Sequence, residues 1–133
     1  MKLSRISVII NTAFERRTMK GLVLDTETNE IRKVEAEELH DYYKAMHCDC
    51  IDVVHTRLLG QHIAIVCDDE ALCKDKVPIH SVTLPRGRHI FNSVIFTLIE
   101  PGSDDFSDLS KDLEDAILQR VIHDEFGHVI VVL

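Results

Sequence analysis

Short apolar runs rich in β-branched residues recur along the first hundred residues, and polar or turn-forming residues bound each of them. Runs of this length and composition predict strands rather than helices. Residues 26–29 separate two of these runs and residues 85–88 separate another two, so both pairs are expected to form hairpins. The predicted strands cover residues 5–11, 21–25, 30–34, 49–56, 62–67, 79–84 and 89–100.

Two stretches show the spacing of an amphipathic helix instead. The first covers residues 35–46, with apolar residues at i, i+3, i+4 and i+7: Leu39, Tyr42, Tyr43 and Met46. The second covers residues 108–126, where apolar residues recur every four positions: Leu109, Leu113, Ile117 and Val121.

The ends of the second helix and the segment after it complete the predicted fold. Ser107 is expected to cap the helix and Gly127 to end it. Residues 128–133 are almost wholly apolar, which favours a central, doubly buried strand. The pattern therefore predicts an α+β domain with a mixed, mostly antiparallel sheet of about five to seven strands and two helices.

Composition narrows the classes of protein to consider. The chain has 133 residues, with 15 Lys and Arg against 23 Asp and Glu and a formal net charge of −8. This size predicts one domain spanning residues 1–133. The acidic balance argues against general DNA binding, because that affinity comes from basic residues on phosphates. No run approaches the ~20 apolar residues of a membrane span, so a cytoplasmic protein without a membrane segment is expected.

The middle of the chain carries short motifs in a fixed order. The predicted first helix precedes CIDVV at residues 50–54, IAIVCDDE at 63–70, a loop with Pro78, and FNSVIFTLI at 91–99. Over about residues 30–100 this layout resembles a family of small uncharacterised proteins carried mainly by bacteriophages, plasmids and integrated elements. In that family an I-E-x-V strand, an I-V-C-D-E-E-G passage, a loop Pro and a G-T-F-x-I strand recur in this order. The resemblance implies a mobile-element accessory protein and supplies no mechanism.

The cysteines raise the question of a metal site. In a cytoplasmic chain they are expected to be thiols. Structural zinc sites usually pair their ligands as C-x₂₋₄-C, a spacing that Cys48 and Cys50 do not have. On a strand these two residues share one face, where cysteines often pack as small apolar side chains. Packing is the favoured interpretation, with zinc or another divalent metal as the alternative; no cofactor is expected.

Three acidic residues, Asp68, Asp69 and Glu70, directly follow a predicted apolar strand. Carboxylates at the end of a strand are typical ligands of divalent metals and typical catalytic acids. The alternative is an acidic turn in which the side chains accept hydrogen bonds from local backbone N–H groups. The second interpretation is favoured, and the first is kept as a metal-site hypothesis.

Two basic clusters interrupt the acidic chain. One contains Arg16 and Arg17, and the other contains Arg86, Arg88 and His89 around Gly87. Guanidinium groups bind phosphate and carboxylate with two hydrogen bonds, so these residues are candidates for an anion site. A solvated turn is the simpler interpretation.

The acidity itself is concentrated near the C-terminus, where residues 100–133 contain nine acidic and two basic residues. Asp108, Asp112 and Asp115 lie off the apolar stripe of the predicted second helix. Most such faces are solvated. A row of carboxylates can also contact a basic surface, so this face is a candidate for contact with a host protein.

No nucleotide-binding or nucleophile motif is present, which favours a protein that is not an enzyme. The leading expectation is an accessory protein that binds a host protein or a small anionic ligand. A small metal-dependent hydrolase is one alternative, and a structural or assembly subunit is another. A homodimer formed through exposed strand edges is a further expectation.

Overall fold

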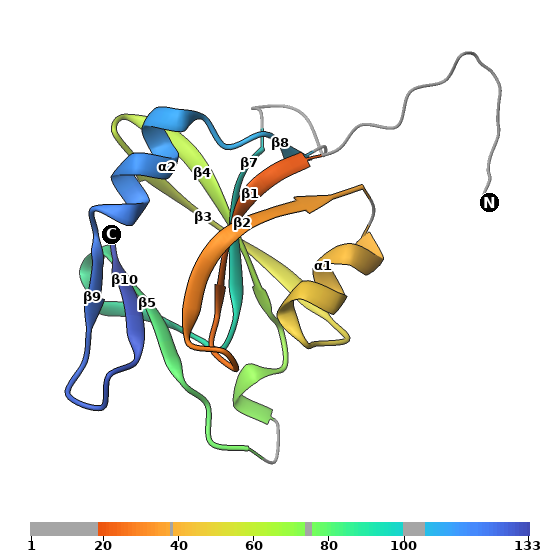
Figure 1. Ribbon diagram of the computed structural model, residues 1–133, viewed down its shortest axis with the longest axis vertical. Coiled ribbons are helices and arrows are strands. Elements are labelled where there is room, and N and C mark those ends of the chain that lie inside the picture. The colour runs from red at the N-terminus through yellow and green to blue at the C-terminus, as the bar shows by residue number, and fades with distance from the viewer. Residues whose placement is uncertain (1–18, 38, 74–75, 100–105) are drawn as a thin grey trace, which may run out of the picture.

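The computed structural model describes residues 19–37, 39–73, 76–99 and 106–133 (Figure 1). The predicted strand at residues 5–11 lies outside these ranges. The described helices are α1 (Leu39–Met46) and α2 (Lys111–Leu118), with short 3₁₀ turns at Ala71–Cys73 and Pro85–Gly87. The described strands are β1 (Met19–Asp25), β2 (Glu30–Ala36), β3 (Ile51–Leu58), β4 (Gln61–Asp68), β5 (His80–Leu84), β6 (Arg88–Phe91), β7 (Val94–Ile99), β8 (Phe106–Ser107), β9 (Val121–His123) and β10 (Val129–Val132).

The strands form two sheets. The larger sheet has the order β2-β1-β7-β4-β3, with β8 added to β7, and all of its pairs are antiparallel. The smaller sheet has the order β6-β5-β10-β9, and only the β5–β10 pair is parallel. The predicted α+β class with mostly antiparallel strands and two helices is confirmed.

The main core lies between one face of the larger sheet, the smaller sheet and α2 (Figure 1). Alternation along each strand sends every second side chain to this core. Leu22 and Leu24 of β1 and Phe96 of β7 reach it from the larger sheet, while Val131 of β10 reaches it from the smaller one. All four are at most 1% exposed, so this layer excludes water and holds the two sheets together.

The opposite face of the larger sheet is covered by α1 (Figure 1). Here the alternate residues Val23 of β1 and Ile95 of β7 pack with Tyr42 and Met46 of the helix. The predicted helical spacing correctly placed Tyr42 and Met46 on the buried face. The two central strands β1 and β7 are therefore buried on both faces, which explains their nearly continuous apolar sequences.

The first helix is shorter than predicted. The pattern indicated residues 35–46, but α1 starts at Leu39, and Glu35 and Ala36 belong to β2. The register with β1 continues to Ala36, which is paired with Met19. Strand pairing thus prevails over the helical preference at these two positions.

The second helix was predicted over residues 108–126 and spans only Lys111–Leu118. Its N-cap is Ser110, whose Oγ accepts a hydrogen bond from the Leu113 N–H, so the expected cap at Ser107 was wrong. Residues beyond the helix turn into β9 and pair with β10. Gly127, with φ of 82°, serves the turn between these strands rather than the end of the helix.

The long predicted strand over residues 89–100 is divided into β6 and β7. Asn92 adopts φ of 66° at the break. Its side chain Oδ1 accepts a hydrogen bond from the Ile79 N–H, and its own N–H donates to the Ile79 carbonyl. This bend lets β6 enter the smaller sheet while β7 enters the larger one. The predicted central strand at the C-terminus is confirmed, because β10 lies between β5 and β9.

A membrane-crossing helix would have to be long and apolar, and neither helix within the described ranges meets that requirement.

Candidate functional site

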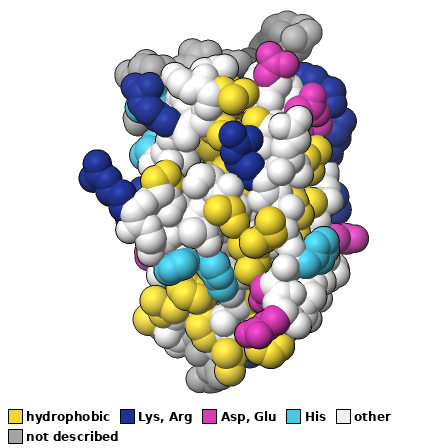
Figure 2. All heavy atoms as spheres, turned by 90° about the vertical axis from the view of Figure 1, so that its left-hand side faces the viewer, with side chains coloured by type: hydrophobic (Ala, Val, Ile, Leu, Met, Phe, Trp, Pro, Cys, Tyr) yellow, Lys and Arg dark blue, Asp and Glu magenta, His cyan; other side chains and the backbone are white. Residues whose placement is uncertain are grey.

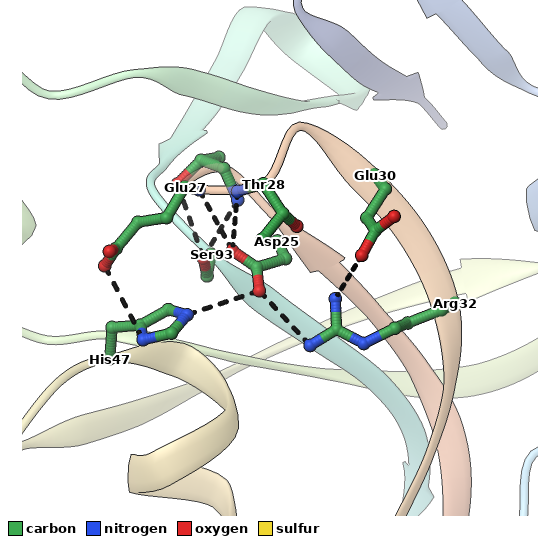
Figure 3. Close-up of polar contacts among 8 residues, drawn as sticks. Asp25, Glu27, Thr28, Glu30, Arg32, His47 and Ser93 are labelled. Atoms are coloured by element: carbon green, nitrogen blue, oxygen red, sulfur yellow. Dashed lines mark hydrogen bonds and ion pairs between the residues drawn. The ribbon is translucent and has the colours of Figure 1, made fainter.

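The hairpin that joins β1 to β2 holds a buried carboxylate. Asp25 ends β1 and is 1% exposed. Its Oδ1 accepts hydrogen bonds from the backbone N–H groups of Glu27 at 2.9 Å and Thr28 at 3.3 Å. The Thr26 N–H donates to Ser93 Oγ at 3.0 Å, which ties the turn to the start of β7. The turn is therefore held by the Asp25 side chain at its own start and by the Ser93 side chain beside β7 (Figure 3).

His47 approaches this carboxylate from the end of α1. Its backbone has φ of 57°, and the next N–H, that of Cys48, donates to the Tyr43 carbonyl at 3.1 Å. This is the closing turn of a helix in which the left-handed position is usually glycine. The His47 ring lies with Nε2 at 3.2 Å from Asp25 Oδ2 and Nδ1 at 3.7 Å from Glu27 Oε2 (Figure 3). Both ring nitrogens thus face carboxylates.

A guanidinium group completes the surroundings of Asp25. Arg32 of β2 lies 3.2 Å from Asp25 Oδ2 and donates a second bond to Glu30 at 3.2 Å. Burial raises the pKa of Asp25, but hydrogen bonds from His47, from two backbone N–H groups and from Arg32 outweigh it. The pKa of Asp25 is lowered as a result, so this carboxylate is charged at neutral pH.

A pocket of about 460 Å³ opens beside this cluster. Its volume falls within the range of small-molecule sites, roughly 300–1,000 Å³. Hydroxyl, amide, carboxylate, imidazole and ammonium groups share its wall with a few apolar side chains. The lining residues are Thr26, Glu27, Met46, His47, Asp68, Cys73, Lys76, Val77, Ile79, Asn92 and Ser93.

A second pocket of about 380 Å³ is lined in part by the 3₁₀ turn at Ala71–Cys73. It brings together three residues singled out from the sequence, namely Asp68, Asp69 and His89. The Asp68 and Cys73 side chains contribute to both pockets. Asp68 is buried, and its Oδ1 accepts a hydrogen bond from the Glu70 N–H at 2.9 Å, as the acidic-turn interpretation predicts.

The cysteines named as metal candidates have different surroundings. Cys48 is buried in the smaller core under α1, whereas Cys50 is exposed. The Glu70 carboxylate raises the pKa of the Cys50 thiol, and burial raises that of Cys67 to about 11. Within the described part of the chain, no three His, Cys, Asp or Glu side chains are grouped as metal ligands. The metal hypothesis stays a prediction.

The basic candidates separate into two groups. Arg16 and Arg17 lie outside the described residues. Arg86, Arg88 and His89 are exposed together at the β5–β6 hairpin, where Arg86 has φ of 67°. The His89 ring lies with Nδ1 at 3.1 Å from His80 Nε2. The structure brings these three together, and anion binding by them stays a prediction.

The acidic candidates around α2 are partly engaged within the molecule. Asp108 Oδ1 accepts a hydrogen bond from the Lys20 N–H at 2.9 Å. Asp115 forms an i,i+4 ion pair with Lys111 at 2.9 Å. Asp112 is exposed on the first turn of the helix. Contact of this face with a host protein stays a prediction.

Sequence reasoning missed the Asp25–His47 cluster. The sequence pattern places Asp25 at the end of a predicted strand and assigns no role to His47. One signal was available, because an Asp directly after an apolar run and before a polar turn is typical of a side chain that bonds the turn backbone. The contact with His47 depends on how α1 packs on the sheet, which no local pattern encodes.

These features define a small α+β protein with a polar pocket between a hairpin turn, a helix end and a loop. The chain belongs to the family described as Domain of unknown function (DUF3846), whose model matches residues 19–122. This match supports the resemblance to an uncharacterised family and extends it beyond residues 30–100. No curated protein and no solved structure matches the chain. All residues that line the two pockets lie within the matched region.

Proposed function

We propose that this protein is a binding module whose pocket beside His47 takes a small polar ligand with both a cationic and an anionic group. The observation that supports this most directly is His47 itself. A side chain other than glycine at positive φ costs free energy, and such positions cluster at functional sites. Here the strained backbone conformation directs the imidazole to the pocket wall, where it lies between Asp25 and Glu27.

The charges of the pocket suggest the class of ligand. Glu27 and Asp68 offer carboxylates to a ligand ammonium or amide N–H, while Lys76 offers a cation to a ligand carboxylate or phosphate. Asn92 and Ser93 add neutral polar groups. A ligand with only one sign of charge would leave the opposite set of pocket charges without a partner. Zwitterionic amino acids fit this description, whereas nucleoside monophosphates, polyamines and inorganic phosphate each carry charge of one sign only.

The same groups support binding rather than catalysis. Both nitrogens of His47 face carboxylates, so neither is set aside to move a proton of a substrate. Outside this pocket, the thiols of Cys50 and Cys67 have raised pKa values, which disfavours a nucleophilic thiolate at these two positions at neutral pH. The metal-dependent hydrolase is the second candidate, and elemental analysis of the purified protein separates the two.

Isothermal titration with amino acids, nucleoside monophosphates, polyamines and inorganic phosphate tests the proposal. Saturable binding of a ligand with both charges is expected. Lys76→Glu and His47→Ala should each weaken it about tenfold or more, or about 1.4 kcal/mol. The matched control is Arg86→Glu with Arg88→Glu, which lies outside this pocket and should leave binding unchanged. Unchanged affinity in the two pocket variants would show that the ligand binds elsewhere.

The resemblance to phage- and plasmid-borne proteins supports a proposal for the setting of this function. We propose that the chain acts in the bacterial cytoplasm as an accessory protein of a mobile element. The small ligand would then be a host or phage metabolite whose level the protein senses or buffers. Comparison of host metabolite levels with and without expression of the chain tests this assignment.

A further inference from the structure

The outer edge of β9 is a strand edge that no described residue pairs with. In the smaller sheet, β9 is the last strand and lies at the margin of the molecule (Figure 1). The two outer strands of the larger sheet, β3 and β2, carry protecting features. Asp52 Oδ1 accepts the Val53 N–H on β3, while β2 presents Arg32 and Lys33 to solvent.

The hydrogen bonds to β10 show which groups of β9 point outward. The Val132 N–H donates to the Arg120 carbonyl, and the Asp124 N–H donates to the His128 carbonyl. Hydrogen-bonded pairs alternate along an antiparallel ladder, so Ile122 faces β10 in the same way. The N–H and C=O groups of Val121 and His123 therefore point away from the sheet.

We propose that two copies of this chain pair through β9 in antiparallel register, with Ile122 opposite Ile122 across a two-fold axis. This register places Val121 opposite His123 of the other copy. Each of these pairs can exchange two hydrogen bonds, so all four outward groups of each copy are satisfied. A shift by two residues in either direction leaves half of them unpaired.

The side chains fit the same register. Arg120 comes to lie opposite Asp124 of the other copy, which places opposite charges on each side of the central isoleucines. Within one copy Arg120 donates to the Ala116 carbonyl and Asp124 accepts from backbone N–H groups of its own turn, so these charges add long-range attraction rather than new hydrogen bonds. Ile122 is 49% exposed, which is high for an isoleucine in a strand, and pairing would cover it. The segment Arg120 to Asp124 is thus self-complementary in charge and in its outward backbone groups, as a two-fold interface requires.

The surface around this edge is suited to association. Figure 2 shows the side of the molecule on which β9 lies, and hydrophobic and histidine side chains gather in its lower half. The exposed apolar residues of this region include Phe126 at the hairpin tip and Val132 on β10. The paired edge is short, so a reversible dimer is expected rather than an obligate one.

Sedimentation velocity of the full chain over a series of concentrations tests the proposal. Dimer is expected to grow with concentration. Ile122→Lys places two ammonium groups face to face across the two-fold axis. His123→Pro removes an outward N–H donor that does not bond to β10. Each variant should therefore shift the population to monomer. Leu59→Lys is the matched control, since Leu59 is an exposed apolar residue on the β3–β4 turn, outside the smaller sheet, and should leave the dimer unchanged.

Hydrogen exchange distinguishes this interface from any other dimer. The Ile122 N–H should be protected at every concentration because it bonds within the sheet. The N–H groups of Val121 and His123 should gain protection only as dimer forms. A chain that stays monomeric, or a dimer that persists in both folded variants, would overturn the proposal, as would a dimer without added protection at Val121 and His123.

Discussion

The carboxylate of Asp25 and the imidazole of His47 lie 3.2 Å apart, although one ends β1 and the other follows α1. The contact fixes the end of the helix against the hairpin turn and forms one wall of the pocket. It also explains why a residue other than glycine occupies a left-handed position at the helix end. The stability of the site and its shape therefore depend on the same pair.

Two substitutions at His47 separate the stabilisation that its side-chain contacts provide from the free energy lost to its left-handed backbone conformation. His47→Ala loses the contacts with both carboxylates but keeps the strain, and should lower the free energy of unfolding by about 1 kcal/mol. His47→Gly loses the same contacts and relieves the strain, so it should be about 1 kcal/mol more stable than the alanine variant. Urea denaturation of the three proteins measures both differences. Equal stability of the two variants would mean that the backbone at this position carries no strain.

The acid stability of the protein should depend on Asp25. The native pKa of this carboxyl lies below its ordinary value of 3.8, so folding favours the charged form. Its contribution is fully present above pH 3.8 and is lost as the pH falls through the lower native pKa. Asp25→Asn removes this contribution. Unfolding free energies measured over a series of acidic pH values should therefore show a gap between wild type and variant that narrows toward low pH, and parallel curves would contradict the argument.

Alkylation of the thiols should not follow exposure alone. Cys50 and Cys73 are both exposed, but the Glu70 carboxylate raises the pKa of Cys50. Iodoacetamide reacts with the thiolate, so Cys50 should react slowly at neutral pH, and Cys67, with a pKa of about 11, more slowly still. Glu70→Gln should speed the labelling of Cys50 and leave Cys67 unchanged, as peptide mass spectrometry can measure. If the Cys50 rate does not rise in this variant, the carboxylate is not the cause.

The parts of the fold that local pattern encodes were predicted correctly. The β1–β2 hairpin, the buried face of α1 at Tyr42 and Met46, and the central position of β10 all follow from apolar spacing and turn residues. The end of the second helix was not predicted, because Val121 continues the four-residue spacing of α2 while belonging to β9. A residue that packs on the same core from either conformation cannot be assigned from spacing alone.

The site was predicted less well than the fold. Asp68 and His89 were named for different reasons, and the structure places both at one pocket only because β4 and β6 come close in space. Asp25 and His47 were missed as a pair, since their contact depends on the crossing of α1 over the larger sheet. The sequence identifies which side chains have reactive or charged groups, but which of these groups lie in contact depends on tertiary packing.

A close backbone approach between β1 and β7 gives a direct test of the fold. A Cβ atom added at Gly21 of β1 would lie 2.5 Å from the Phe96 carbonyl oxygen of β7, a contact that no side-chain rotation can relieve. Gly21→Ala must therefore move one central strand and should cost about 2 kcal/mol or more. Gly87→Ala is the matched control, because a Cβ there meets no atom within 4 Å and the cost is limited to the strain of φ at 73°. Thermal and urea denaturation should rank wild type above Gly87→Ala and Gly87→Ala above Gly21→Ala, and the reverse order of the two variants would show that β1 and β7 are not packed this closely.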